Sequence, residues 1–210
     1  MPGMNPRAPI TRDGADAAAA ALYRAVCGLL RRLLPAARRD WLALLPDAPA
    51  LRRTAPATLP VLGWLPQARA CATPETQALV DAVADMAGAL PWGQNYSAAD
   101  FGAAFQARYG FMELIGPRGP FAAADIACGL LLFAPETEYP QHRHEAEEIY
   151  VVLAGAAEWR AGAADYAVAP PGAVLHRPSW IPHATRIGAE PMLALYLWRG
   201  GDLMQKSEIG

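Results

Sequence analysis

The chain has little of what marks disulfide-rich, nucleic-acid-binding and membrane proteins. Cys27, Cys71 and Cys128 lie far apart and form no C-x-x-C pair, which argues against a disulfide framework or a thiolate metal site and fits a reducing cytoplasm. Lys206 is the single lysine, and 18 Lys and Arg against 20 Asp and Glu provide no basic surface for nucleic acid. No apolar run is long enough to span a membrane, and we find no targeting signal. We therefore expect a cytoplasmic protein that binds neither nucleic acid nor membranes.

Histidine is absent from the first 141 residues, and all four histidines lie between residues 142 and 183. Two of them belong to the motif His142-x-His144-x3-Glu148-x-Tyr150. If this segment is one β-strand, these four side chains share a face because they are an even number of residues apart. Two or three imidazoles with one carboxylate suit zinc, iron, manganese, nickel or cobalt. The motif therefore predicts a site for one divalent transition metal.

The segment after Gly172 provides the next ligand. Pro178 and His183 follow Gly172 at intervals of six and five residues, and His183 leads into an apolar run. We predict His183 as the remaining metal ligand. An alternative register uses His176, but His176 lies where the preceding strand is expected and is followed by Arg177-Pro178.

These spacings resemble the two motifs of the cupin superfamily. The first is H-x-H-x3-E-x6-G, from His142 to Gly155, and the second is G-x5-P-x4-H, from Gly172 to His183. The resemblance implies an all-β cupin barrel (jelly roll) that holds a divalent metal through three His and one Glu. Cupins usually have Gly at the position of Trp180 and Asn at that of Ile187, so the turn geometry is open. The alternative is a cupin that has lost its metal.

A cupin barrel needs about a hundred of the 210 residues, so other structure precedes it. Apolar residues at helical spacing and the residues Asp16, Ser97 and Thr73-Pro74 as helix starts predict an α-helical N-terminal region. We predict helices over 16–34, 40–45, 74–90 and 98–108, with a proline-rich irregular connection over 46–66. Short β-rich runs predict strands over 111–115, 126–133, 148–153, 156–160, 165–168, 173–175, 184–187 and 192–198. The predicted regions are a flexible tail (1–14), the helical region (15–108), the barrel (109–200) and a C-terminal tail (201–210).

A second resemblance is more specific and covers residues 73–200. The chain resembles the cupin-type dimethylsulfoniopropionate (DMSP) lyases, which cleave DMSP to dimethyl sulfide and acrylate. The segments that carry it are Trp92 to Tyr96, Tyr109 to Gly119, Tyr139 to Tyr150, Pro182-His183-Ala184 and Trp198. The family's general base, the tyrosine after the metal-binding Glu, corresponds to Tyr150, and Tyr139 matches a second tyrosine at the pocket. Alternatively, Tyr150 only hydrogen-bonds a ligand.

A sulfonium cation offers no hydrogen-bond donor, so aromatic faces are its best partners. Tyr96, Trp180 and Trp198 are the predicted substrate-binding aromatics beside Tyr139, whereas Trp159 and Tyr196 are expected to pack in the barrel. The alternatives to a DMSP lyase are a metal-dependent dioxygenase, a lyase for another small carboxylate and a non-catalytic binding cupin. The sequence leaves a homodimer open.

Overall fold

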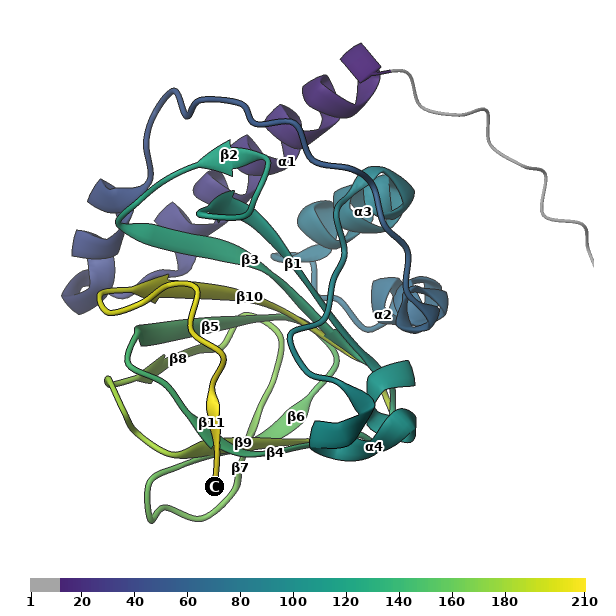
Figure 1. The fold of residues 1–210 in the computed structure, drawn as a ribbon, viewed down its shortest axis with the longest axis vertical. Helices are drawn as coiled ribbons and strands as arrows, with labels where there is room; N and C mark the ends of the chain where they lie inside the picture. Colours follow the sequence, from purple (N-terminus) through teal and green to yellow (C-terminus); the bar gives the residue numbers. More distant parts are fainter. Residues whose placement is uncertain (1–11) are drawn as a thin grey trace, which may run out of the picture.

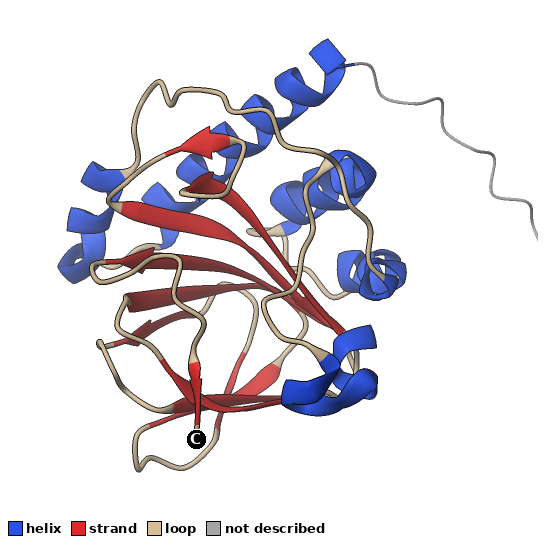
Figure 2. Ribbon diagram, in the orientation of Figure 1, coloured by secondary structure: helices blue, strands red, loops and turns tan. Residues whose placement is uncertain are grey.

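The computed structural model describes residues 12–210; residues 1–11, most of the predicted tail, lie outside the described residues. Most helices lie on one side of two facing β-sheets, and the helix Ala98–Ala107 lies apart from them, beside the second sheet (Figures 1 and 2). The helices are α1 (Arg12–Leu33), η1 (Ala36–Leu44), η2 (Pro60–Trp64), α2 (Leu65–Ala70), α3 (Gln77–Met86), η3 (Ala87–Ala89) and α4 (Ala98–Ala107), where η marks a 3-10 helix. The strands are β1 (Tyr109–Gly116), β2 (Phe121–Ala122), β3 (Ile126–Phe133), β4 (Glu138–Arg143), β5 (Glu147–Ala154), β6 (Ala157–Ala161), β7 (Ala167–Ala169), β8 (Val174–Arg177), β9 (His183–Ile187), β10 (Met192–Arg199) and β11 (Glu208–Ile209).

The two sheets form the cupin barrel that the sequence predicts. One sheet has the strand order β2-β1-β3-β10-β5-β8, and the other has the order β11-β4-β9-β6-β7. Each of the eight predicted strands overlaps an observed one, while β2, β4 and β11 were not predicted. The fold class is therefore confirmed, with an α-helical N-terminal region beside the barrel.

Strand β10 shows how the six-stranded sheet is covered on both faces. Alternate residues of a strand point to opposite faces. One set packs with the buried residues of the helices and consists of Leu193, Leu195 and Leu197. The other set packs in the barrel interior and consists of Ala194, Tyr196 and Trp198. All of these side chains are buried, which explains why β10 appears as a continuous apolar run.

The assumption that residues 142–150 form one strand is wrong. β4 ends at Arg143 and β5 begins at Glu147, and the two strands belong to different sheets. β4 escaped prediction because it contains Pro140 and has mostly polar residues, both unusual within a strand. The side chains of the first motif therefore converge because the two sheets face each other, not because they share one strand face.

The helical region differs from prediction at its helix starts. α1 begins at Arg12, so Asp16 lies inside it instead of capping it. The predicted N-cap Thr73 lies before α3, whose first residue is Gln77, because the Thr73 N–H donates to Thr76 Oγ1 at 3.1 Å and closes a separate turn. The cap Ser97 of α4 is confirmed, with its N–H donating to Asp100 Oδ2 at 2.7 Å.

The segments predicted as 40–45 and 46–66 also differ in detail. The first is a 3-10 helix that begins earlier, at Ala36, and the second ends in η2 and the start of α2. Pro60 and Pro66 lie in the first positions of these two helices, where proline is tolerated because its missing N–H has no helical partner. Among the described residues, no helix is both long and apolar enough to cross a membrane.

Candidate metal centre and pocket

Three histidines come together inside the barrel. His142 is near the end of β4, His144 follows in the connection to β5, and His183 begins β9, where it is the register partner of His142. One ring nitrogen of each lies within 4.8 Å of the others, and all three residues are buried. The structure thus brings together the three histidines that the two motifs predict.

Each of these histidines has its ring fixed by a backbone carbonyl. The Nδ1 atoms lie 2.8 Å from Pro140 O for His142, 2.8 Å from Ala146 O for His144 and 2.9 Å from Ile181 O for His183. A carbonyl only accepts hydrogen bonds, so each Nδ1 must carry the proton and donate. The Nε2 atoms are thereby left with a lone pair each, the arrangement found in metal-binding histidines.

Glu148 reaches this cluster from the facing sheet. Its Oε2 lies 3.0 Å from His144 Nε2 and 3.4 Å from His183 Nε2. A carboxylate oxygen and an unprotonated Nε2 both offer lone pairs, so their proximity calls for a cation between them. His183 Nε2 is also buried without a hydrogen-bond partner among the described residues. The donor set therefore fits a divalent metal held by three imidazoles and one carboxylate.

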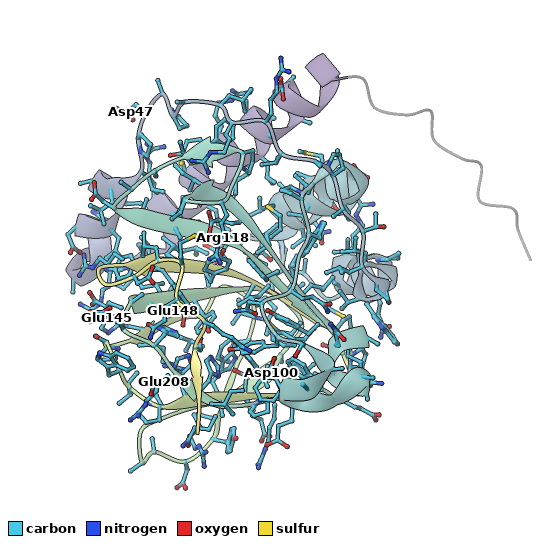
Figure 3. All side chains as sticks on the ribbon, in the orientation of Figure 1. Asp47, Asp100, Arg118, Glu145, Glu148 and Glu208 are labelled. Carbon is cyan, nitrogen blue, oxygen red and sulfur yellow. The ribbon has the colours of Figure 1, made fainter. Side chains whose placement is uncertain are left out.

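The electrostatics of the cluster favour deprotonated ligands. Burial, together with nearby His183, lowers the pKa of His142 well below its usual value. Burial by itself raises the pKa of Glu148, but His144 and His183 lower it far below its usual range overall. Figure 3 shows Glu148 inside the fold, in contrast to Asp47 and Glu145 at its edge. A neutral imidazole and an ionised carboxylate are the forms that bind metals.

The alternative ligand His176 lies elsewhere. It pairs with Ile149 across β5 and β8, on the face opposite to that of Glu148. Its Nε2 is 2.5 Å from Glu147 Oε1, and its Nδ1 is 3.1 Å from Arg38 Nη2 of the helical region. His176 therefore belongs to a polar contact between η1 and the outer face of the sheet, and the register through His183 is the one that the geometry supports.

In the turn before His183, Trp180 takes a backbone conformation that favours glycine. Trp180 has a φ of 60°, in the left-handed region that residues other than glycine rarely adopt. Its N–H donates to His144 O at 2.8 Å, which links the turn to a candidate ligand. Its ring is 42% exposed and lies against Arg143, outside the pocket lining. The structure does not bring Trp180 together with the other predicted substrate-binding aromatics.

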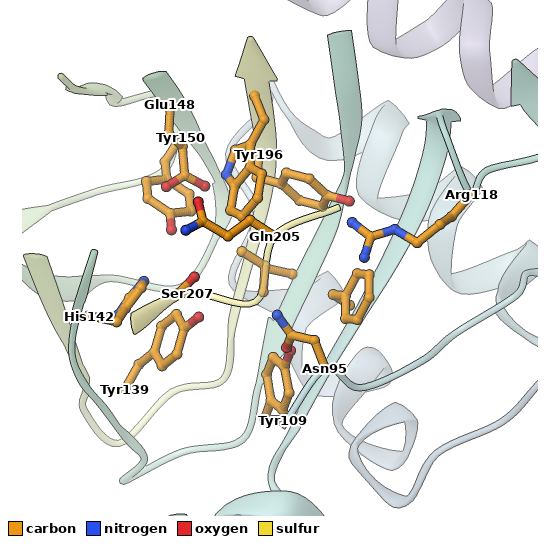
Figure 4. Close-up of a pocket in the computed structure, with 13 residues that line it drawn as sticks. Asn95, Tyr109, Arg118, Tyr139, His142, Glu148, Tyr150, Tyr196, Gln205 and Ser207 are labelled. Atoms are coloured by element: carbon orange, nitrogen blue, oxygen red, sulfur yellow. The ribbon is translucent and has the colours of Figure 1, made fainter. Parts of the chain in front are cut away.

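A pocket opens beside the metal cluster (Figure 4). The empty space there is about 430 Å³, which includes open solvent. Its lining consists of Asn95, Tyr109, Phe111, Arg118, Leu131, Tyr139, His142, Glu148, Tyr150, Tyr196, Trp198, Gln205 and Ser207. The candidate ligands His142 and Glu148 thus face a space that a small molecule can enter.

The two predicted catalytic tyrosines flank the cluster. The centroid of the Tyr139 ring lies 4.1 Å from that of the His142 ring, and the centroid of the Tyr150 ring lies 6.2 Å from that of the His183 ring. Tyr139 and Tyr150 line the pocket, while Tyr96 lies behind Tyr139 and shares a hydrogen bond of 3.1 Å with its hydroxyl. Tyr96 is therefore placed to orient Tyr139 instead of contacting a ligand directly.

The remaining aromatics divide between the pocket and the core. Trp198 lines the pocket, with its ring 4.2 Å from that of His144. Trp159 packs on Tyr150 at 4.8 Å and is not part of the lining, as expected for barrel packing. Tyr196, which was also expected only to pack, does line the pocket.

Several polar pocket residues were not predicted as site residues. Arg118 follows β1, Asn95 precedes α4, and Gln205 and Ser207 lie in the segment predicted as a C-terminal tail. That segment instead crosses to β4, where the register pairs of β11 are Glu208 with Arg143 and Ile209 with His142. The available clues were the two segments of the family resemblance that contain Asn95 and Arg118, and Gly116-Pro117 before Arg118, which marks a turn at the end of a strand.

Comparison with known proteins identifies the family. The family model described as dimethylsulfoniopropionate lyase matches residues 35–194, which include both motifs and most of the pocket. The chain belongs to the DMSP lyase family. The putative DMSP lyase DddL of Cereibacter sphaeroides is similar, with 38% identity over 78% of this chain and 70% of its own length. The DMSP lyase DddQ of Ruegeria pomeroyi has 34% identity over 74% of this chain and 78% of its own.

Solved structures of DMSP lyases have the same fold. The crystal structure of Ruegeria pomeroyi DddQ aligns with a TM-score of 0.83 at 32% identity. The alignment covers 92% of this chain and 96% of the DddQ chain. A second structure, from work on the DMSP lyases RdDddP and RnDddQII, aligns with a TM-score of 0.86 at 28% identity. The alignment covers 93% of this chain and 99% of the other chain. The similarity to DMSP lyases therefore includes the helical region as well as the barrel.

Proposed function

We propose that this protein is a metal-dependent carbon–sulfur lyase that cleaves DMSP to dimethyl sulfide and acrylate. Its membership of the DMSP lyase family supports the substrate. The observation that carries the chemistry is the pairing of a metal-competent cluster with Tyr150 on the wall of one pocket. The proposed ligands are His142, His144, Glu148 and His183.

The proposed reaction is a β-elimination with Tyr150 as the base. When bound, a divalent ion supplies positive charge that favours an anionic substrate carboxylate and an ionised phenol nearby. Tyr150 takes the proton from the carbon next to the carboxylate, and the electrons of that C–H bond form the double bond of acrylate. The C–S bond breaks with its electron pair on sulfur, so neutral dimethyl sulfide leaves. No redox cofactor takes part.

The surroundings of Tyr150 agree with a role that depends on added positive charge. Burial and the Glu148 carboxylate raise the pKa of the Tyr150 phenol well above its usual value. Buried Arg177, the register partner of Glu148, acts in the opposite direction. Since the protein environment by itself keeps the phenol neutral, base activity at Tyr150 is expected only together with the metal.

Headspace analysis tests the proposed function. Metal-loaded protein incubated with DMSP under anaerobic conditions is expected to release dimethyl sulfide and acrylate in equal amounts. The absence of oxygen separates a lyase from a metal-dependent dioxygenase, which needs oxygen for turnover. A protein that releases no dimethyl sulfide, or releases it only in air, is not the proposed lyase.

The pocket aromatics are expected to select the sulfonium cation. Trp198→Leu and Tyr139→Leu keep apolar bulk but remove the ring face, so binding of DMSP is expected to weaken by up to the roughly 2 kcal/mol of a desolvated cation–π contact. We expect the inhibitor 4-methylpentanoate, in which a neutral carbon replaces sulfur, to lose much less binding affinity in these variants. The measurements are KM for DMSP and the inhibition constant of the isostere.

Trp180→Leu is the matched control for this series, because Trp180 is exposed and lies outside the pocket lining. It should change neither constant. Equal losses for the cation and its neutral isostere in the Trp198 and Tyr139 variants would mean that these rings only pack against the ligand.

A further inference from the structure

The pocket has a second polar end, away from the metal cluster. Figure 4 shows His142, Glu148 and Tyr150 on one side and Arg118 on the other, with the Tyr196 hydroxyl directed toward Arg118. Gln205 lies between the two ends, and Ser207 lies at the metal end beside His142 and Tyr139. The metal-dependent reaction proposed above makes no use of Arg118 or of the Tyr196 hydroxyl.

Arg118 is held in place by a buried carboxylate. Its backbone N–H and Nε donate to the two oxygens of Glu113 at 2.5 and 3.1 Å, and the N–H of Gly119 adds a third bond at 2.8 Å. Its Nη2 donates to Leu203 O at 3.2 Å, and the guanidinium lies 5.6 Å from the centre of the Phe111 ring. Glu113 is thus already satisfied largely by backbone groups, and Arg118 Nη1 has no partner among the described residues. A fixed guanidinium retains donors that face the pocket.

Tyr196 adds a hydrogen-bonding group with no partner. Its hydroxyl is buried and makes no hydrogen bond among the described residues, and the same is true of Nε1 of Trp198 on the pocket wall. Leaving a buried polar group unpaired costs about 1–3 kcal/mol, so such groups in a pocket point to a ligand that pairs with them. Arginine and tryptophan side chains only donate, and a tyrosine hydroxyl also donates. The complementary ligand group is therefore an acceptor, and beside a guanidinium it is an anion.

The strand register relates the two ends. Tyr196 of β10 is the register partner of Tyr150 of β5, and both side chains face the barrel interior. Neighbouring strands lie about 4.8 Å apart, so the two rings start one strand spacing from each other. A short aliphatic chain can connect a group at the metal end with a group near the Tyr196 hydroxyl.

We propose that Arg118 and Tyr196 form a carboxylate-binding subsite, so that the pocket binds small aliphatic dicarboxylates with one carboxylate at each end. The inference rests on the proposed function only in that the first carboxylate lies at the metal end. A planar guanidinium with a neighbouring hydroxyl suits the two oxygens of a carboxylate.

Calorimetry with matched ligands tests the subsite. Succinate, glutarate and adipate are titrated into the metal-loaded protein beside butyrate, valerate and hexanoate, which have the same chain lengths and a single carboxylate. We expect at least one dicarboxylate to bind 10-fold or more tightly than its matched monocarboxylate. If no dicarboxylate exceeds its partner, the subsite does not exist.

Two variants show where the second carboxylate binds. Tyr196→Phe removes only an unpaired hydroxyl and is expected to fold, and Arg118→Gln combined with Glu113→Gln removes the buried ion pair as a unit. Each should reduce the dicarboxylate preference by at least fivefold and leave the affinity for monocarboxylates within twofold. The matched control is Arg186→Gln, which breaks an exposed pair with Glu138 outside the pocket and should keep the preference. A preference that persists in both pocket variants means that both carboxylates bind at the metal, and the proposal is wrong.

The outcome is independent of lyase activity. A dicarboxylate preference without release of dimethyl sulfide would keep the subsite and refute the proposed substrate. Release of dimethyl sulfide without a dicarboxylate preference would keep the lyase and remove the subsite.

Discussion

Replacing Tyr150 with phenylalanine is expected to lower kcat for DMSP cleavage by at least about 100-fold, the usual loss when an acid–base group is removed. The substitution deletes one oxygen and keeps the ring, which packs on Trp159 at 4.8 Å, so folding should persist. The metal ligands are untouched. KM should change little, because the proposed role of the hydroxyl is proton transfer and not binding.

Tyr139→Phe is the matched variant for this prediction. Both tyrosines are buried in the pocket wall beside a candidate metal ligand, but the Tyr139 hydroxyl is already shared with Tyr96. Its loss should therefore cost less turnover than the loss of the Tyr150 hydroxyl. Steady-state kinetics with metal content measured on the same samples gives the comparison. A near-normal rate for Tyr150→Phe, with a large loss for Tyr139→Phe, would transfer the base to Tyr139.

The barrel strands could be predicted because the sequence patterns have local causes. β10 is buried on both faces and is therefore a continuous apolar run, and β3 is buried throughout in the same way. β4 and β11 could not be predicted, since neither contains an apolar run and both obtain their hydrogen bonds from distant partners. β4 pairs with β9, more than 40 residues away, and β11 is two residues long. Strands of this kind are defined by the sheet that they join.

In the candidate site, too, the residues with a local sequence pattern could be predicted, and those placed by distant contacts could not. His142, His144 and Glu148 were found because ligand chemistry at fixed spacing is visible in a single segment, even though that segment proved to be two strands, and His183 was found through the spacing of the second motif from Gly172. Arg118 and Gln205 reach the pocket from connections whose course depends on contacts such as that between Arg118 and Leu203. No local pattern records such a contact, so the second end of the pocket required the structure.

Removing a metal ligand is expected to have an equally large effect. His183→Ala should weaken metal binding by more than the roughly 10- to 100-fold that loss of an outer-shell partner causes, and should abolish cleavage of DMSP. Elemental analysis after gel filtration measures the retained metal. A second readout does not depend on activity: added metal should raise the Tm of the wild type and not that of the variant, because only the wild type gains binding free energy in the folded state.

The choice of variants also tests the composition of the ligand set. His176→Ala removes a histidine that contacts Glu147 and Arg38 outside the cluster, so it should retain metal like the wild type. Glu148→Gln keeps the shape of the side chain but removes the charge that faces His144 and His183. If the carboxylate is a ligand, this variant should lose at least about 10-fold in metal affinity, because an amide is a weaker ligand for these ions than a carboxylate. Unchanged affinity in Glu148→Gln would reduce the set to three histidines, and loss of metal in His176→Ala would refute the assignment of His183.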